Sequence, residues 1–408
     1  MMTELSVVLH MRAVGRLSLR EGTTTFEFME SYLDSPNRPV LGQAFEEQPR
    51  SRWRQAARAP RWFSNLLPER GPMREFITRE LGLKTENETE LLALVGLDLP
   101  GAVEVVAETA PADHSSAARF EAEQVRRDVG SGEPVVRFSV AGVQLKLSMV
   151  ADQKALRLPG RGELGGNYVK FPGSYPFIPE NEYAMMSLAS RCGIDIPEVR
   201  LVDGADLGPL PRSFERFRGS KVYVIERFDR VVSGEKAHIE DMNQVANQWP
   251  EQKYEGASYE SLGRTIRALC GEEDFLQYVR RVAFNILVGN EDAHLKNWSL
   301  WYPDRSRPRL SPAYDIVSTV IYEDLARETG LKIGGSRSAH GVTLATFRRL
   351  VEKAGFPGAE EAEEVVRDVG KRLDAAVDDV RQESTLPDGM WTRWREYHES
   401  LPLQASCR

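Results

Sequence analysis

The chain has 408 residues, of which 41% are hydrophobic and 28% are charged, and this composition excludes a disordered or collagen-like protein. Its 53 Lys and Arg residues against 61 Asp and Glu residues give a net charge of -8, which argues against a chain that binds nucleic acid alone, because phosphate binding relies on an excess of basic side chains. A chain of this length predicts two or three packed units.

The three cysteines are widely spaced and form no C-x-x-C pair, which argues against a disulfide framework or a zinc site and favours a reducing compartment. No run approaches the ~20 apolar residues of a membrane span. The short apolar run 7–9 is too short for the core of a signal peptide. We therefore expect a cytoplasmic protein with no membrane association.

The first predicted unit, residues 1–110, is rich in β-structure. Alternating apolar residues and turn signals predict short strands within 5–33 and a strand at 102–106, with helices at 73–83 and 87–95. Asn87, with Glu90 three residues later, is typical of a helix N-cap. The segment 107–118, rich in Ala, Ser, Pro and acidic residues, is predicted to be a linker.

The second unit, 119–255, is predicted to be mixed α/β, and the third, 256–408, helical. Strand-like runs lie at 135–140, 145–150, 168–171, 199–202 and 222–228, and helical patterns at 180–192, 275–288 and 362–380. Gly193 follows the first of these helices where a C′ glycine belongs. Trp391, Trp394 and Tyr397 are expected to be core anchors. The chain is thus predicted to have an α+β fold.

The segment with the clearest chemical meaning directly follows the apolar helix 275–288. Asp292 precedes Asn297 by five positions, which is the D-x-x-x-x-N spacing of a kinase catalytic loop. In such a loop the Asp accepts the proton of the substrate hydroxyl and the Asn oxygen holds Mg²⁺. The alternative is a polar loop that caps the helix.

A second carboxylate, Asp315, follows in the segment Pro312-Ala313-Tyr314-Asp315, and a hairpin of 299–302 with 309–310 is predicted to separate it from Asn297. A carboxylate in this place suits a second magnesium ligand. The alternative is that Asp315 caps a following helix.

Lys170 lies inside an otherwise apolar strand. It is a candidate phosphate-binding lysine, and Glu182, near the start of the next helix, is the candidate carboxylate that orients it. The alternatives are a solvated lysine at the edge or outer face of a sheet and a glutamate that stabilises the helix N-terminus.

Two further segments could contact a nucleotide. Residues 139–146 form a segment rich in small residues, whose backbone N–H groups could approach phosphates, although the segment taken alone favours a plain β-turn. The strand 222–228 enters the charged segment 229–230 and could hold a nucleotide base. Its alternative is a core strand followed by a cluster of salt bridges.

These segments occur in the order of a protein-kinase-like fold, and together they resemble the HipA family, the serine/threonine-kinase toxins of HipA–HipB toxin–antitoxin pairs. The matching text is SVAGVQLK (139–146), VKFP (169–172), NEY (181–183), IERFDR (225–230), EDM (240–242), DAHLKN (292–297) and PAYD (312–315). The resemblance implies a two-lobed kinase-like fold with a β-rich N-terminal subdomain, an ATP-binding lobe and an all-helical C-terminal lobe.

The resemblance also implies roles for individual residues. Asp292 would be the general base, and Asn297 and Asp315 would bind Mg²⁺. Contacts with ATP would come from Ala141, Gly142, Val143, Gln144, Leu145, Lys146, Lys170, Glu226, Arg227, Phe228, His294, Lys296, Asn297, Tyr314 and Asp315. Ser139 matches a serine that family members phosphorylate on themselves. We interpret His294 as a hydrogen-bonding residue that shapes the loop, because the kinase scheme needs no histidine.

The implied function is an ATP- and Mg²⁺-dependent serine/threonine protein kinase that phosphorylates a cellular protein, an aminoacyl-tRNA synthetase being one candidate, and arrests growth. The implied partner is a HipB-like DNA-binding antitoxin. The chain would contact DNA only through this partner. Two alternatives stay open: a kinase of a small hydroxylated molecule, and a non-catalytic kinase-like repression partner. Intact Asp292, Asn297, Asp315 and Lys170 argue against the second alternative.

Overall fold

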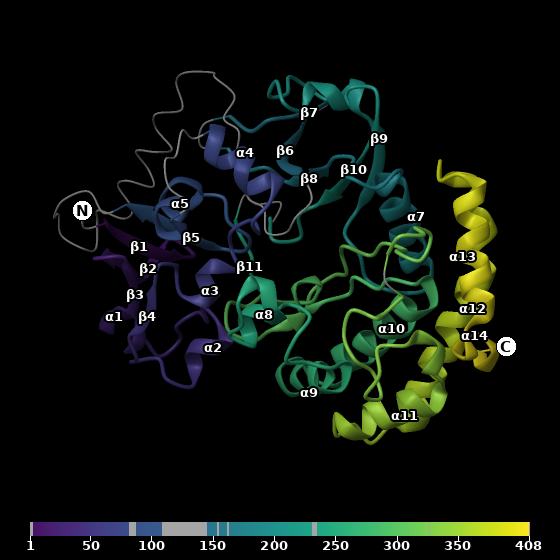
Figure 1. Ribbon diagram of the computed structural model, residues 1–408. Coiled ribbons are helices and arrows are strands. Elements are labelled where there is room, and N and C mark those ends of the chain that lie inside the picture. The colour runs from purple at the N-terminus through teal and green to yellow at the C-terminus, as the bar shows by residue number, and fades with distance from the viewer. Residues whose placement is uncertain are drawn as a thin grey trace.

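The computed structural model describes residues 3–80, 87–107, 145–152, 155–160, 163–230, 235–325 and 327–407. The described chain forms a β-rich N-terminal unit, a second sheet with one long helix, and a mostly helical C-terminal region (Figure 1). The predicted α+β class is confirmed. Residues 139–144 of the predicted loop 139–146 lie outside the described residues, as does the strand expected at 135–140.

The N-terminal unit is built on an antiparallel sheet in the order β4-β3-β2-β1-β5. Its strands are β1 (Thr3–Leu9), β2 (Arg12–Arg20), β3 (Thr23–Phe28), β4 (Trp53–Ala56) and β5 (Val103–Ala107), and its helices are α1 (Glu30–Leu33), α2 (Gln43–Glu46), α3 (Arg61–Ser64), α4 (Pro72–Glu80) and α5 (Glu88–Val95). Alternate residues of β1, such as Leu5, Val7 and Leu9, are fully buried, as the period of two requires. Asn87 caps α5 as predicted, its side chain accepting from the N–H groups of Thr89 and Glu90.

The second sheet has the order β7-β6-β8-β10-β9 and is also antiparallel. Its strands are β6 (Lys146–Asp152), β7 (Ala155–Arg157), β8 (Asn167–Lys170), β9 (Val199–Asp203) and β10 (Lys221–Glu226), and the helix α7 (Ile178–Arg191) follows β8. Gly193 has φ 75°, the conformation predicted for a C′ residue. The apolar side chains of this sheet share one core with the N-terminal unit, where Phe171 and Phe76 both contact the ring of Phe214. The two sheets are therefore packed against each other.

The C-terminal region surrounds the buried helix α10 (Glu272–Val288). Its other helices are α8 (Met242–Val245), α9 (Tyr259–Cys270), α11 (Leu344–Lys353), α12 (Ala359–Glu383), α13 (Asp388–Ser400) and α14 (Pro402–Cys407), with short 3₁₀ turns η1 (Gly204–Asp206), η2 (Glu215–Phe217), η3 (Pro250–Gln252), η4 (Leu295–Asn297) and η5 (Ala339–Gly341) along the chain. A small sheet, β11 (His238–Asp241), β12 (Ser299–Tyr302) and β13 (Arg309–Leu310), includes the predicted hairpin. Trp391 and Trp394 are buried in the core, as predicted, and Tyr397 packs against it.

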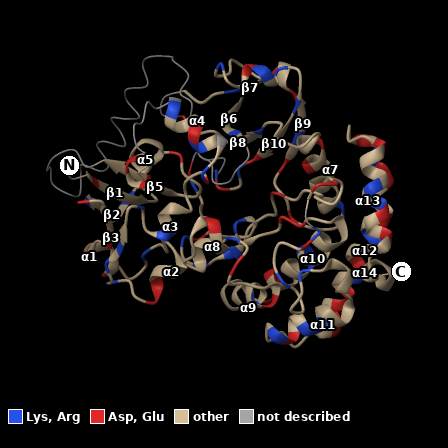
Figure 2. Cartoon of the chain, viewed as in Figure 1, with Lys and Arg blue, Asp and Glu red and all other residues tan. Residues whose placement is uncertain are grey.

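Two predicted absences can be examined in the described residues. Cys192, Cys270 and Cys407 are free thiols in this part of the chain. Among the described helices, none combines the length and the apolar character needed to cross a bilayer. Charges of both signs occur along the surface helices, α13 being one example (Figure 2).

Candidate active site

A cavity of about 1030 Å³ lies where the three parts of the chain meet. The N-terminal unit contributes Asn65, Leu66 and Glu69 to its wall, and the other walls come from β6, β8, β10, the start of α7 and the loops of the C-terminal region. Most residues singled out from the sequence line this cavity; within the described chain they are Leu145, Lys146, Lys170, Glu226, Arg227, Phe228, Asp292, His294, Lys296, Asn297, Tyr314 and Asp315. Residues distant in the sequence thus face one space.

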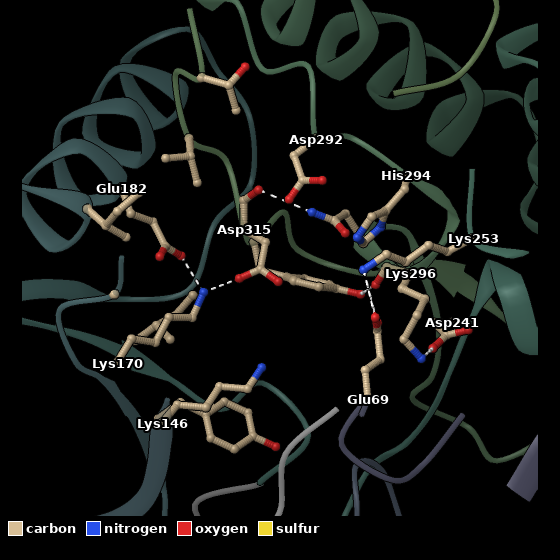
Figure 3. A pocket seen from close by; sticks show the side chains of 18 of the residues that line it. Glu69, Lys146, Lys170, Glu182, Asp241, Lys253, Asp292, His294, Lys296 and Asp315 are labelled. Atoms are coloured by element: carbon tan, nitrogen blue, oxygen red, sulfur yellow. Dashed lines mark hydrogen bonds and ion pairs between the residues drawn. The ribbon is translucent and has the colours of Figure 1, made fainter. Parts of the chain in front are cut away.

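Lys170 lies at the centre of a buried charge cluster (Figure 3). Its ammonium group donates to Glu182 Oε1 at 2.5 Å and to Asp315 Oδ1, so strand β8, helix α7 and the segment after β13 converge on it. The residues Lys170 and Glu182 are 3% and 1% exposed, which excludes a solvated edge lysine. Glu182 thus contacts Lys170, as expected for the carboxylate proposed from the sequence to orient this lysine.

The charges of this cluster shift one another's pKa values. Burial alone would lower the pKa of Lys170, but the carboxylates of Asp315 and Glu182 raise it above its usual value. Burial would raise the pKa of Asp315, but Lys170 and Lys146 hold it below its usual value. Lys170 is therefore charged and Asp315 ionised at neutral pH, which are the states that phosphate and metal binding require.

The catalytic-loop candidate begins where α10 ends. Gly289, with φ 68°, closes the helix in the left-handed conformation, and an added Cβ would lie 2.4 Å from a methyl carbon of Val320. The loop that follows is fixed by hydrogen bonds, among them the N–H of Leu295 to the carbonyl of Lys253 at 3.0 Å. A rigid loop of this kind holds reacting groups in place.

Asn297 and Asp315 are adjacent in space, because the side-chain N–H of Asn297 donates to the backbone carbonyl of Asp315 at 3.3 Å. The side-chain oxygen of Asn297 is buried and has no hydrogen-bond partner among the described residues. An amide oxygen and a carboxylate are hard oxygen ligands, so the pair fits Mg²⁺. Asp315 has φ 55° and no helix follows it, so the alternative of a helix cap does not hold.

Asp292 lies across the cavity from Lys170, and in the view of Figure 3 Asp315 is between them. Its carboxylate is accessible within the cavity but surrounded by protein atoms, and this burial raises its pKa, although a hydrogen bond from Tyr254 opposes the shift. A raised pKa in a cavity is suited to a general base. Next to it, Lys253 forms an ion pair of 3.0 Å with Glu69 of the N-terminal unit.

Several predicted nucleotide-binding residues have their charged groups engaged elsewhere. Arg227 is fully buried between Asp98 and Asp229, at 3.0 and 2.9 Å. Lys296 donates to Asp241 at 2.9 Å and to Asn65. Their side chains therefore hold the cavity walls together.

Some of the remaining residues predicted to contact the nucleotide line the cavity, and the others lie outside the described residues. The ring centroids of Phe228 and Tyr314 lie 5.9 Å apart on the cavity wall, and Glu226 is exposed at the end of β10. Lys146 faces the cavity, and burial lowers its pKa to about 8. The predicted residues Ser139, Ala141, Gly142, Val143 and Gln144 lie outside the described residues.

His294, interpreted from the sequence as a hydrogen-bonding residue that shapes the loop, has this role through its backbone and not through its ring Nδ1. Its ring Nδ1 is buried and has no hydrogen-bond partner among the described residues, and the ring instead packs edge-on against Tyr254 with centroids 5.0 Å apart. Its backbone shapes the loop, because its N–H donates to the carbonyl of Asp292 at 2.8 Å. Burial and the charge of Lys253 lower the pKa of His294 to about 3, so the ring is neutral.

Sequence reasoning missed four residues around the predicted base and loop: Glu69, Asp241, Lys253 and Tyr254. Asp241 lies in the segment 240–242 that was matched without a role; it caps α8 and pairs with Lys296. No motif or spacing marks the other three, because they reach the cavity from segments far from 289–297 in the sequence.

Two family models match most of the chain. Residues 5–106 match the family model described as the HipA N-terminal domain, and residues 138–377 match the HipA-like C-terminal domain. The protein "Putative kinase Y4dM" of Sinorhizobium fredii is 37% identical over 365 residues, which cover 86% of each chain. The serine/threonine-protein kinase toxin HipA of Shewanella oneidensis is 27% identical over 350 residues, covering 78% of this chain and 76% of that one.

A solved structure shares the fold. It contains HipA of Shewanella oneidensis MR-1 with HipB and operator DNA, and it superimposes with a TM-score of 0.74, covering 99% of this chain and 96% of that chain at 23% identity. The two family models, together with this shared fold, confirm the resemblance inferred from the sequence. With both family domains present in order, this chain belongs to the HipA family.

Proposed function

We propose that this chain is an ATP- and Mg²⁺-dependent protein kinase that transfers a phosphoryl group to a serine or threonine hydroxyl of a cellular protein. The observation that carries the proposal is the convergence of Lys170, Asn297, Asp292 and Asp315 on one cavity. Kinase catalysis needs positioned positive charge, metal ligands and a base around one phosphoryl group.

Each residue would have a separate task. Lys170, held by Glu182, would bind nucleotide phosphates, and Lys146 beside it would add a second positive charge. Asn297 and Asp315 would hold Mg²⁺, which supplies charge neutralisation at the phosphates when bound. Asp292 would take the proton of the acceptor hydroxyl while the hydroxyl oxygen attacks the γ-phosphorus, and ADP would leave.

The phosphoryl-transfer proposal is tested with radiolabelled ATP and a bacterial lysate, with the Asp292→Asn variant as the matched control. We expect labelled protein bands with the unsubstituted chain, none with the variant, and none after chelation of Mg²⁺. Phosphosite mapping of the bands identifies the acceptor residue, and whether the target is an aminoacyl-tRNA synthetase. Labelled small molecules without labelled protein would instead support the small-molecule kinase.

We further propose that a HipB-like antitoxin restrains the chain and connects it to DNA. Support comes from the related Shewanella oneidensis HipA, whose structure includes HipB and operator DNA, and from the net charge of -8. The test is a gel-shift titration of operator DNA. The chain alone should bind weakly, and tight, salt-sensitive binding by the purified chain alone would contradict the proposal.

Phosphorylation of Ser139 by the chain itself is part of the same proposal and rests on the family resemblance. A phosphate carries about −1.5 to −2 charge at neutral pH, so it would repel the ATP phosphates. Intact-mass analysis after incubation with Mg-ATP tests it, with Asp292→Asn protein as control. An unmodified wild-type chain would show that this switch is absent here.

A further inference from the structure

Tyr254, which follows η3, contacts the predicted base from outside the catalytic loop. Its hydroxyl donates a hydrogen bond to Asp292 Oδ1. The other carboxylate oxygen, Oδ2, has no hydrogen-bond donor among the described residues, although Asp292 lines the cavity. One oxygen is thus engaged and the other is left for a ligand.

Tyr254 is itself held on three sides. Arg337 donates to its backbone carbonyl at 2.6 Å, and the same guanidinium also bonds to the carbonyls of Thr329 and Gly330. The neutral ring of His294 packs edge-on against the tyrosine ring. The backbone carbonyl of the preceding residue, Lys253, accepts a hydrogen bond from the N–H of Leu295. The tyrosine hydroxyl is therefore fixed relative to the catalytic loop.

We propose that Tyr254 is a positioning residue that holds the Asp292 carboxylate through Oδ1 so that Oδ2 faces the hydroxyl of the phosphate acceptor. The inference rests on the proposed kinase function and adds to it a residue that no catalytic motif contains. A carboxylate without this bond can rotate, and the fraction of time that Oδ2 points at the acceptor then falls. Arg337 acts one step further away, by holding the backbone of Tyr254.

The hydrogen bond also has an electrostatic consequence for the base. Burial raises the pKa of Asp292, and the tyrosine hydroxyl lowers it. The other groups that face Asp292 are Lys253, whose charge lowers the same pKa, and Asp315 and Glu69, whose charges raise it. Loss of the tyrosine hydroxyl therefore moves the protonation of the base to higher pH, while the other charges stay in place.

The test is Tyr254→Phe, which keeps the ring against His294 and removes only the hydroxyl. The acceptor is the lysate protein that the unsubstituted chain phosphorylates. At saturating Mg-ATP, the initial rate at which the variant phosphorylates this protein should be about 10- to 100-fold lower. The acid limb of the pH–rate profile should move to higher pH. The affinity for Mg-ATP, measured by calorimetry, should not change, because Tyr254 acts on the acceptor side.

Tyr302→Phe is the matched control. Tyr302 also donates its hydroxyl to a carboxylate, that of Glu240, and accepts from the side chain of Gln43 at 3.1 Å, but neither Tyr302 nor Glu240 lines the cavity. This variant should lower the melting temperature and leave the pH–rate profile unchanged. A purely structural role of Tyr254 would give the same pattern as this control, and that result would overturn the inference.

Failure of the positioning role of Tyr254 can be distinguished from failure of the proposed kinase function. If the unsubstituted chain is active and Tyr254→Phe keeps its rate and its acid limb, the positioning role is wrong and the kinase function stands. If the unsubstituted chain transfers no phosphate, the kinase function is wrong. A crystal structure of Tyr254→Phe then still tests the orientation: we expect the Asp292 carboxylate in more than one rotamer, and a single unchanged rotamer contradicts the inference.

Discussion

Lys146 of β6 and Lys170 of β8 lie directly opposite each other across the antiparallel pair, so both side chains face the same side of the sheet. Lys170 is paired with Glu182 and Asp315, whereas Lys146 has no ion-pair partner among the described residues and packs 5.7 Å from the ring centroid of Tyr168. Like charges directly opposite each other destabilise a sheet. An anionic ligand in the cavity would relieve this repulsion.

Lys146→Met should therefore weaken Mg-ATP binding, because it removes a positive charge expected to bind phosphate. It should not lower the melting temperature, because it also removes the repulsion between Lys146 and Lys170. Burial lowers the pKa of Lys146 to about 8, so its neutral form dominates above that pH. The affinity of the unsubstituted chain should fall as pH rises through 8, and that of the variant should not. Calorimetry across this range measures both. Equal affinities of the two chains would remove Lys146 from the nucleotide site.

Asp292→Asn should abolish phosphoryl transfer and leave ATP binding in place. A general base contributes about 10²–10⁴-fold, and an amide cannot accept the acceptor's proton. Because burial raises the pKa of Asp292, the unsubstituted chain should lose activity on acidification at a higher pH than a solvated aspartate with its usual pKa of 3.8 would cause. The rate of label transfer at fixed Mg-ATP measures this. Near-native activity of the variant would show that another group is the base.

Asp315→Asn should remove the part of the ATP affinity that depends on Mg²⁺. The substitution replaces a charged oxygen ligand with a neutral one and also removes the ion pair with Lys170. Titrations with ATP alone and with Mg-ATP separate these effects, because only the second depends on the metal. Asp304→Asn, on the exposed turn between β12 and β13, is the control. The same gain from Mg²⁺ in both variants would argue against Asp315 as a ligand.

Arg227→Met should destabilise the protein strongly, because it leaves the buried carboxylates of Asp98 and Asp229 with Arg230 as their remaining arginine partner. Breaking a buried pair in this way costs about 3–5 kcal/mol of unfolding free energy. Burial alone would raise the pKa of Asp229, but Arg227 and Arg230 hold it below 3.8. The stabilisation is therefore present above pH 3.8 and is lost as pH falls through the folded pKa.

Thermal unfolding measures the effect, with Arg200→Met as the control, since the Arg200–Glu198 pair is largely exposed. The same variant decides the role of Arg227 at the nucleotide. If its charge only joins the two sheets, the folded variant binds Mg-ATP as the unsubstituted chain does. A lower affinity in a fully folded variant would return Arg227 to the nucleotide site.

Much of the fold could be predicted from local patterns. The helix α10 was expected at 275–288 and spans Glu272–Val288, because its apolar face repeats at spacings of three and four. The strand β10 was expected at 222–228 and ends at Glu226, since Arg227 turns its side chain into a buried ion cluster. Strand boundaries depend on such tertiary partners, which periodicity does not encode.

The order of motifs along the chain was enough to indicate a kinase-like cavity and the HipA family. Asp292 and Asn297 share one loop, so their spacing could be read directly from the sequence. What surrounds them comes from elsewhere: Tyr254 is 38 positions from Asp292, and Glu69 is 184 positions from Lys253. Only the tertiary structure decided these pairs, because a hydrogen bond or ion pair depends on distance in space, and the packing of the N-terminal unit against the catalytic loop sets that distance.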